Sequence, residues 1–238
     1  MSGLVRATAG MALAMVTATA IVTAQAPVTA PVRLLMVGTF HGDEVTARSG
    51  EVWLGLFPTA NGYALRATTL KVKAVRDELL DEENERTGKE VTVGDAREPL
   101  FLVKATPRLR ARAAVPTVFA GESFLEKGSH VRLAGPDGGE YLLTVDSVQM
   151  ASVEAPDPVP YSVLTLALGG ITQRLSTTPD HVGLRLLWAG DVDGDGKLDL
   201  LLDLPSSENA SEHRLFLSTA AGKGELVRQV AVFETVGC

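Results

Sequence analysis

The stretch GDVDGDGKLDLLLDL, residues 190–204, decides how the C-terminal part of this chain folds. Four aspartates crowd into its first part, at Asp191, Asp193, Asp195 and Asp199, and a run of leucines follows them. Carboxylates held this close together repel one another strongly. The crowding is therefore accounted for if a divalent cation neutralises it.

The spacing of these aspartates matches what a loop needs to surround a hard cation. Ca²⁺ takes six to eight oxygen ligands, and a loop supplies them from carboxylates at alternate positions, with a glycine where the chain turns sharply. With Asp191 at the first position, Gly196 falls at the sixth, where a calcium loop turns. The sequence therefore predicts a Ca²⁺ site with the ligands Asp191, Asp193, Asp195, Lys197 (through its carbonyl) and Asp199.

The segments on either side of the loop favour strands. An EF-hand loop has a bidentate glutamate at its twelfth position, where this chain has Leu202. Leucine favours helices, but the apolar run after the loop is of strand length and is closed by Pro205. We therefore expect the loop to join two strands.

About residues 186–226, which contain LWAGDVDGDGKLDLLLDL followed by HRLFLSTAAGKGELV, resemble one FG-GAP/VCBS-type repeat of integrin-like β-propellers. In that family a calcium loop links two antiparallel strands, and a third strand ends in a Gly-x-Gly turn, where residues 222–224 of this chain read Gly-Lys-Gly. The family closes a propeller with several repeats, and this chain has one. The resemblance therefore implies a calcium-clamped β-meander with the ligands named above, and it does not imply a complete propeller.

Most of the remaining chain is rich in Val, Leu, Thr and aromatic residues between Gly and Pro turn signals, which is typical of strands. The fold class predicted is mainly β, with antiparallel hairpins in a sandwich or barrel-like arrangement that ends in the calcium-loop meander. A strand is expected at residues 31–40, and a hairpin at 50–57 and 63–75 around Asn61-Gly62. Residues 89–93 are expected to pair with 99–105. Two further hairpins are expected at 129–150 and at 161–176, the second with a break at Gly169-Gly170.

Three segments have no strand pattern. The acidic residues 75–90 predict either a short helix or an exposed loop, because a helix there would have almost no apolar face to bury. Prolines bound two apparent linkers, at residues 105–116 and 154–160. Two organisations of the mature chain stay open: a β-rich region at 25–160 followed by the C-terminal meander at 161–238, or a single domain at 27–238.

The N-terminus has the pattern of a secretory signal peptide. Arg6 is the first charge, an apolar segment follows from Ala7 to about Thr23, and small residues precede a cleavage site after Ala24. We therefore predict a signal peptide at residues 1–24 and an exported protein, periplasmic or extracellular. The alternative is an uncut membrane anchor. No other apolar run is long enough for a membrane-spanning helix, so no span is expected after cleavage.

The composition narrows the classes of partner. The net charge of −7 is spread along the chain, which argues against nucleic acid. The expected partner is an unidentified protein or glycan. The single cysteine, Cys238, cannot form an internal disulfide, so it is either inert or pairs between chains.

An enzymatic alternative comes from VGTFHGDEV, residues 37–45. The spacing of His41 and Glu44 is similar to the first zinc motif of carboxypeptidase-like and aspartoacylase-like hydrolases, which implies a zinc-dependent hydrolase. Such a site needs a third protein ligand, from His130, His181 or His213. No serine or cysteine nucleophile motif and no phosphate-binding loop accompanies it. We therefore expect a structural or binding role and no enzymatic activity, with the zinc hydrolase as the alternative.

Overall fold

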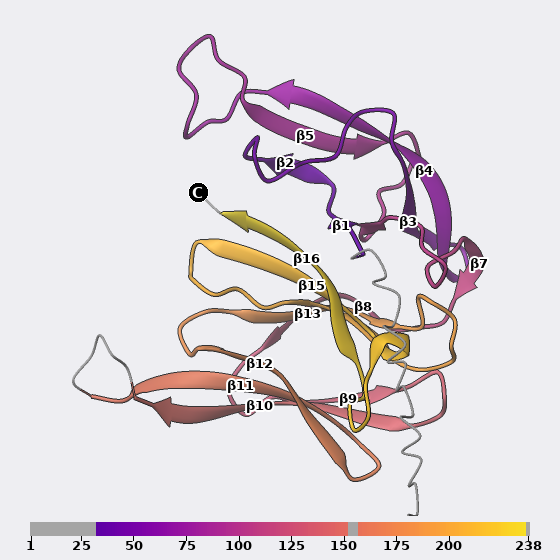
Figure 1. Cartoon of the computed structure of the whole chain (residues 1–238), viewed down its shortest axis with the longest axis vertical. Helices are drawn as coiled ribbons and strands as arrows, with labels where there is room; N and C mark the ends of the chain where they lie inside the picture. The colour runs from indigo at the N-terminus through magenta and orange to yellow at the C-terminus, as the bar shows by residue number, and fades with distance from the viewer. Residues whose placement is uncertain (1–31, 152–156, 237–238) are drawn as a thin grey trace, which may run out of the picture. The chain divides into compact units, whose positions relative to one another are not determined.

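The computed structural model describes residues 32–151 and 157–236, and their regular structure is almost entirely β (Figure 1). Within these ranges no α-helix occurs, and the one helical turn is the 3-10 segment η1 (Ser218–Ala220). Every strand pairing between described residues is antiparallel. The predicted fold class, mainly β with antiparallel hairpins, is confirmed.

The first sheet has seven strands and is built around one long hairpin. Thr59 pairs with Gly62 where β3 turns into β4, as the Asn61-Gly62 signal predicted. β6 and then β1 extend the sheet beyond β3, while β5 and then β2 extend it beyond β4, and β7 also pairs with β4. The strands are β1 (Leu34–Leu35), β2 (Gly38–Phe40), β3 (Val52–Thr59), β4 (Gly62–Val75), β5 (Gly88–Val93), β6 (Leu102–Val103) and β7 (Arg112–Val115).

The second sheet has four strands in the order β12-β11-β10-β9 and consists of consecutive hairpins. Gly169 and Gly170 both have positive φ at the turn between β11 and β12, a conformation that glycine adopts without strain. Both predicted hairpins are confirmed. The strands are β9 (His130–Ala134), β10 (Glu140–Met150), β11 (Val159–Leu168) and β12 (Ile171–Pro179).

The third sheet has five strands and carries the aspartate loop. From β13 to β16 each strand pairs with the next, so this part of the chain is a β-meander, and β8 joins it beside β13. The strands are β8 (Thr117–Leu125), β13 (Leu184–Gly190), β14 (Asp199–Asp203), β15 (Ala210–Leu217) and β16 (Arg228–Val236).

The five-stranded sheet lies between the other two sheets (Figure 1), and an apolar core packs against each of its faces. On one face Leu201 and Trp188 belong to the core that contains residues of the seven-stranded sheet. On the other face Leu200 and Leu202 belong to the core shared with the four-stranded sheet. Side chains alternate between the faces of a strand, so a central strand covered on both sides needs apolar residues in succession. This explains the leucine run in β14.

The structure corrects two details of the sequence interpretation. Residues 89–93 and 99–105 do not pair with each other: β5 pairs with β4 and β2, whereas β6 pairs with β3 and β1. The predicted linker at 105–116 contains strand β7. For the acidic residues 76–87, the loop alternative is the observed one, since they contain neither helix nor strand. Hydrophobic patterning predicts a strand but does not specify its partner, which is why the predicted pairing of 89–93 with 99–105 is wrong.

Candidate metal site

The aspartate loop, residues 191–198, joins β13 to β14 at the edge of the buried core. The ends of the loop are held by the pairing of Gly190 with Asp199. The Asp191 N–H also donates to the carbonyl of Pro116, which directly precedes β8, at 2.8 Å. Gly194 and Gly196 have φ of +77° and +83°. These left-handed conformations favour glycine, and they allow the loop to fold back on itself.

Asp191 organises the loop from its first position. Its carboxylate accepts hydrogen bonds from the N–H groups of Gly194, Asp195 and Gly196, the last two at 3.1 and 2.9 Å. Short side chains of this kind commonly cap a turn by bonding to nearby backbone groups. As a result, the loop curls around this carboxylate.

Three of the predicted ligands come together in this loop. Carboxylate oxygens of Asp191, Asp193 and Asp195 all lie within 4.8 Å of one another, with the first two residues buried and the third exposed. Across the part of the chain that the structure describes, this is the one group of three or more His, Cys, Asp or Glu side chains arranged so that it could hold a metal ion. Its donors are all oxygens, the ligands that hard cations prefer.

Asp199, the fourth aspartate, has its carboxylate outside this group. It is fully buried at the start of β14 and accepts hydrogen bonds from the Val192 N–H at 2.9 Å and from the N–H and hydroxyl of Ser218 at 2.8 and 3.0 Å. In this arrangement Asp199 ties the loop to η1. Lys197 is exposed, and its N–H donates to the Asp195 carboxylate at 2.8 Å. Metal binding by the Lys197 carbonyl stays a prediction.

Two hydroxyls that the sequence did not single out complete the surroundings of the loop. The Ser218 hydroxyl lies 2.9 Å from an Asp195 carboxylate oxygen and 3.0 Å from an Asp199 one, so its single proton can be donated to either carboxylate. The Thr219 hydroxyl donates to Asp193. Both residues come from η1, directly after β15. Because they lie 19 to 26 positions after the aspartates that they contact, local spacing could not reveal them.

Arg112 brings a positive charge to the loop from the seven-stranded sheet. Its Nη2 donates to the Asp193 carbonyl at 2.6 Å, and its Nε is buried with no hydrogen-bond partner. A Cβ placed on Gly194 would lie 1.7 Å from the guanidinium carbon. The guanidinium therefore lies directly against the Gly194 backbone, in space that is free because residue 194 is glycine.

The electrostatics favour neutralisation of the loop. Burial raises the pKa of Asp193, and the neighbouring carboxylate of Asp195 adds to the rise. Burial also raises the pKa of Asp199 well above its ordinary value, with a further contribution from the charge of Asp193. Both shifts mean that the folded protein disfavours the ionised carboxylates when no cation is bound.

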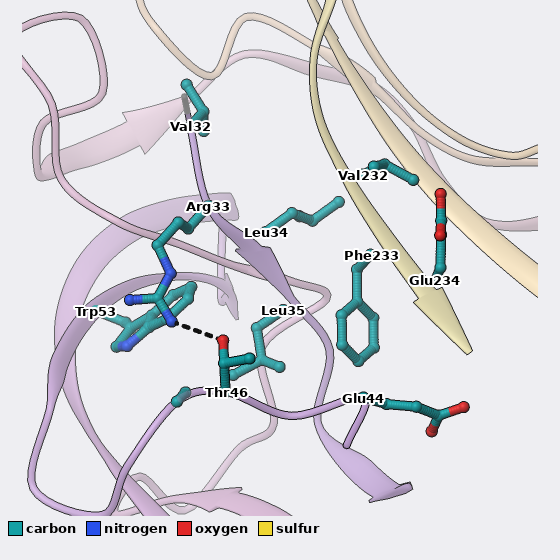
Figure 2. A pocket seen from close by; sticks show the side chains of 11 residues that line it. Val32, Arg33, Leu34, Leu35, Glu44, Thr46, Trp53, Val232, Phe233 and Glu234 are labelled. Carbon is teal, nitrogen blue, oxygen red and sulfur yellow. Dashed lines mark hydrogen bonds between the residues drawn. The ribbon is translucent and has the colours of Figure 1, made fainter. Parts of the chain in front are cut away.

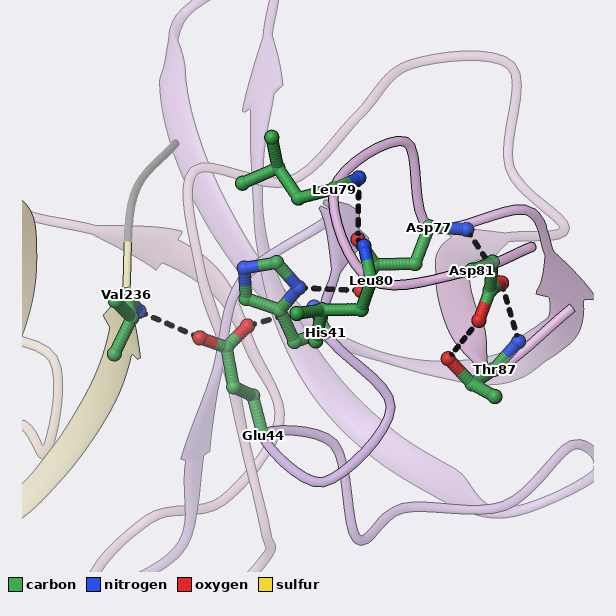
Figure 3. Close-up of polar contacts among 8 residues, drawn as sticks. All are labelled: His41, Glu44, Asp77, Leu79, Leu80, Asp81, Thr87 and Val236. Carbon is green, nitrogen blue, oxygen red and sulfur yellow. Dashed lines mark hydrogen bonds and ion pairs between the residues drawn. The ribbon is translucent and has the colours of Figure 1, made fainter.

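His41 and Glu44, the residues of the zinc alternative, make other contacts (Figure 3). His41 Nδ1 contacts the buried carboxylate of Asp77. The Glu44 carboxylate accepts hydrogen bonds from the N–H of His41 at 2.9 Å and from the N–H of Val236. Glu44 therefore caps a turn and connects it to the end of β16.

The other histidines lie on different elements. His130 is on β9, His213 is on β15, and His181 lies between β12 and β13. No group of three metal-ligating side chains in the described ranges includes His41. These residues therefore do not bring together the three ligands that a catalytic zinc needs.

A groove of about 380 Å³ lies between β1 and β16, and the charged residues that line it are Arg33, Glu44 and Glu234 (Figure 2). Trp53 lies at its base, with the Arg33 guanidinium 5.0 Å and Lys104 Nζ 4.9 Å from the ring. Lys104 also donates to Glu51 at 2.8 Å, and this hydrogen bond lowers the pKa of Glu51 to about 2. Of the charged residues that line the groove, Arg33 contacts Thr46 and Glu51, and Glu44 caps the turn at His41.

Comparisons with known proteins do not identify the chain: no family model, no curated protein and no solved structure matches it. The FG-GAP/VCBS-type resemblance therefore remains a prediction from the sequence. None of the described residues forms a helix of the length and apolarity needed to cross a membrane. The predicted signal peptide at 1–24 and Cys238 lie outside the described residues, as does part of the predicted linker at 154–160.

Proposed function

We propose that this protein is an exported, calcium-binding β protein with a structural or binding role, in which one Ca²⁺ clamps the turn between β13 and β14. The observation that carries the proposal is the convergence of Asp191, Asp193 and Asp195, whose carboxylate oxygens lie within 4.8 Å of one another. A cation there would replace mutual repulsion with attraction to all three carboxylates.

Calcium suits this loop better than other common cations. The donors are oxygens in an irregular loop, and Ca²⁺ tolerates irregular geometry, whereas Mg²⁺ demands a near-ideal octahedron. The proposed set is completed by the Lys197 carbonyl and Asp199. Asp199 Oδ2 accepts one hydrogen bond, from the Val192 N–H, so this oxygen keeps a lone pair that could bind the ion.

Two sequence features support export and a non-catalytic role. Residues 1–24 have the signal-peptide pattern, and calcium is plentiful outside the cytoplasm. Residues 186–226 resemble an FG-GAP/VCBS-type repeat. In such modules the ion orders a β-meander. The partner in this proposal is a protein or glycan whose identity is open.

The proposal is tested by thermal unfolding of calcium-loaded protein before and after addition of EDTA. Because an ion that binds only the folded state stabilises it, EDTA should lower the Tm. The variant Asp193→Asn with Asp195→Asn should melt at the same temperature with and without EDTA. A wild-type Tm that does not respond to EDTA would refute the proposal.

A further inference from the structure

The loop between β4 and β5, residues 76–87, exposes two large apolar side chains next to each other (Figure 3). Leu79 is 58% exposed and Leu80 is 67% exposed. Exposed leucines forgo the stabilisation that comes from removing apolar surface from water. We call this segment the acidic loop, because it also contains the acidic residues Asp77, Glu78, Asp81, Glu82, Glu83 and Glu85.

Two buried aspartates hold the acidic loop in the conformation that exposes the leucines. The Asp77 carboxylate accepts hydrogen bonds from the N–H groups of Leu79 and Leu80 at 3.1 and 3.2 Å. The Asp81 carboxylate accepts them from the N–H groups of Asp77 and Thr87 at 2.8 and 2.7 Å. The backbone that carries the leucines is therefore fixed in advance, which lowers the entropic cost of binding a partner there.

The exposed side of the acidic loop has negative charge that other residues do not balance. Glu82 and Glu83 are exposed, and neither forms an ion pair within the part of the chain that the structure describes. An anionic lipid surface would repel these groups. The complementary surface is a protein surface with positive charge beside small apolar side chains.

The chain has a surface of this kind at β7. Residues 104–114, here called the basic segment, contain no acidic residue. Arg108 and Arg110 are exposed and form no ion pair with any residue in the described ranges. Ala113 and Ala114 of β7 are also exposed, and their small side chains leave space for larger apolar groups. The basic segment therefore matches the acidic loop in charge and in shape.

The two surfaces lie too far apart to meet within one chain. The acidic loop follows Val75 at the end of β4, whereas β7 pairs with β4 at Tyr63 and Leu65. A stretch of about ten residues, as between Leu65 and Val75, spans about 33 Å along a strand. The loop and β7 accordingly lie at opposite ends of β4 (Figure 1). A contact between these surfaces therefore joins two copies of the chain.

From this complementarity we propose that copies of the chain associate head to tail, with the acidic loop of one copy docked on the basic segment of the next. The two leucines pack against the exposed alanines of β7, and the two unpaired glutamates face the two unpaired arginines. Because the contact joins different surfaces, it produces a ring or an open chain of copies. The association uses no residue of the aspartate loop, so it does not depend on calcium binding.

Sedimentation velocity of the purified chain tests the association. A reductant is present so that Cys238 cannot link two chains. The weight-average sedimentation coefficient should rise with protein concentration up to about 1 mM. The rise should be smaller at about 1 M NaCl than at about 0.1 M, because the Debye length falls from about 10 Å to about 3 Å. A monomer's coefficient at every protein concentration overturns the proposal.

Charge reversal tests which surfaces meet. The double variants Glu82→Lys with Glu83→Lys and Arg108→Glu with Arg110→Glu should each stay monomeric at concentrations where the wild type associates, because like charges then face each other. An equimolar mixture of the two variants should associate again, since each reversed surface meets the opposite charge on the other variant. The proposal is also overturned if either variant alone associates as the wild type does, or if the mixture stays monomeric.

Two further variants separate the contact from general effects of charge and folding. Glu126→Lys with Glu208→Lys changes the net charge equally at exposed residues outside both surfaces, and it should associate as the wild type does. Leu79→Ser with Leu80→Ser should weaken the association without lowering the Tm, because both side chains are exposed. Loss of association in the Glu126 and Glu208 variant, or unchanged association in the leucine variant, would contradict the assigned interface.

Discussion

The Arg112 guanidinium donates a hydrogen bond to the main-chain carbonyl of Asp193 at 2.6 Å. This contact joins β7 of the seven-stranded sheet to the aspartate loop of the five-stranded sheet. The guanidinium lies against Gly194, where no side chain intervenes. The loop is thus held by its own strands, by η1 and by a residue 81 positions away.

Substitutions at two glycines of the loop separate the effect of backbone strain on stability from the effect of losing the Arg112 contact. Both have positive φ, but a Cβ at Gly196 meets no atom within 4 Å, whereas one at Gly194 overlaps the Arg112 guanidinium. Gly196→Ala should therefore cost only the left-handed conformation, about 1–2 kcal/mol. Gly194→Ala should cost more, because it also displaces the arginine.

Urea denaturation of both variants and of Arg112→Ala measures these costs as free energies of unfolding. The double variant Gly194→Ala with Arg112→Ala should be less destabilised than the sum of its single changes, since the alanine then has space. Equal destabilisation by the two glycine changes would contradict the assigned contact.

Ser218 should couple the aspartate loop to η1. The variant Ser218→Ala leaves Asp199 with two backbone donors but removes the hydroxyl that lies within hydrogen-bond distance of both Asp195 and Asp199. We expect a loss of about 1–3 kcal/mol in the free energy of unfolding, because the Asp199 carboxylate left behind is fully buried. Ser207→Ala, at an exposed serine of the β14–β15 turn, should leave stability unchanged. Similar losses in both variants would argue against the coupling.

The His41–Asp77 pair should make stability depend on pH. Their hydrogen bond raises the pKa of His41 and lowers the pKa of Asp77. The His41 contribution is fully present below the unfolded histidine pKa of about 6.5 and is lost as pH rises through the raised value. The Asp77 contribution is present above the unfolded pKa of about 3.9 and is lost as pH falls through the lowered value. The pair therefore stabilises the folded protein most between the two unfolded pKa values, about 3.9 and about 6.5.

Melting of the wild type and of His41→Gln at about pH 5.5 and about pH 8.5 checks this dependence. The Tm difference between the two proteins should be larger at the lower pH. Asp77→Asn should behave as His41→Gln does, since it keeps the shape but loses the charge. His130→Gln, at an exposed histidine of β9, should follow the wild type at both pH values. A Tm difference that is the same at both pH values would exclude the His41–Asp77 pair as the source of the pH dependence.

The sequence predicted those features that depend on local pattern. The aspartate spacing placed three carboxylates in one loop, and the short leucine run closed by Pro205 indicated a strand. Contacts between distant segments left no local signal, which is why Arg112 and Ser218 were missed. The spacing of His41 and Glu44 fits a zinc motif, but it also fits a turn in which the glutamate caps the backbone three residues earlier. The spacing alone does not distinguish these interpretations.

The central strand β14 should be sensitive to loss of side-chain volume. Leu201 is 1% exposed and packs with Trp188 in the core facing the seven-stranded sheet. Leu201→Ala should lower the free energy of unfolding by about 2–5 kcal/mol through the cavity it leaves. Val232→Ala, at a residue of the same sheet that is 39% exposed, should cost far less in the same urea titration. Comparable losses would contradict the position of β14 between two cores.

Calcium binding by the purified chain tests the central claim most directly. Isothermal titration of metal-free protein with CaCl₂ should give one ion per chain, with a dissociation constant on the order of 10⁻⁴–10⁻³ M if the loop resembles other extracellular calcium modules. Asp193→Asn with Asp195→Asn should abolish the binding, whereas Asp180→Asn, at an aspartate held by Ser147 and Ser162, should retain it. Absence of saturable binding up to about 10 mM calcium, ten times the upper end of that range, would contradict a calcium clamp at the aspartate loop.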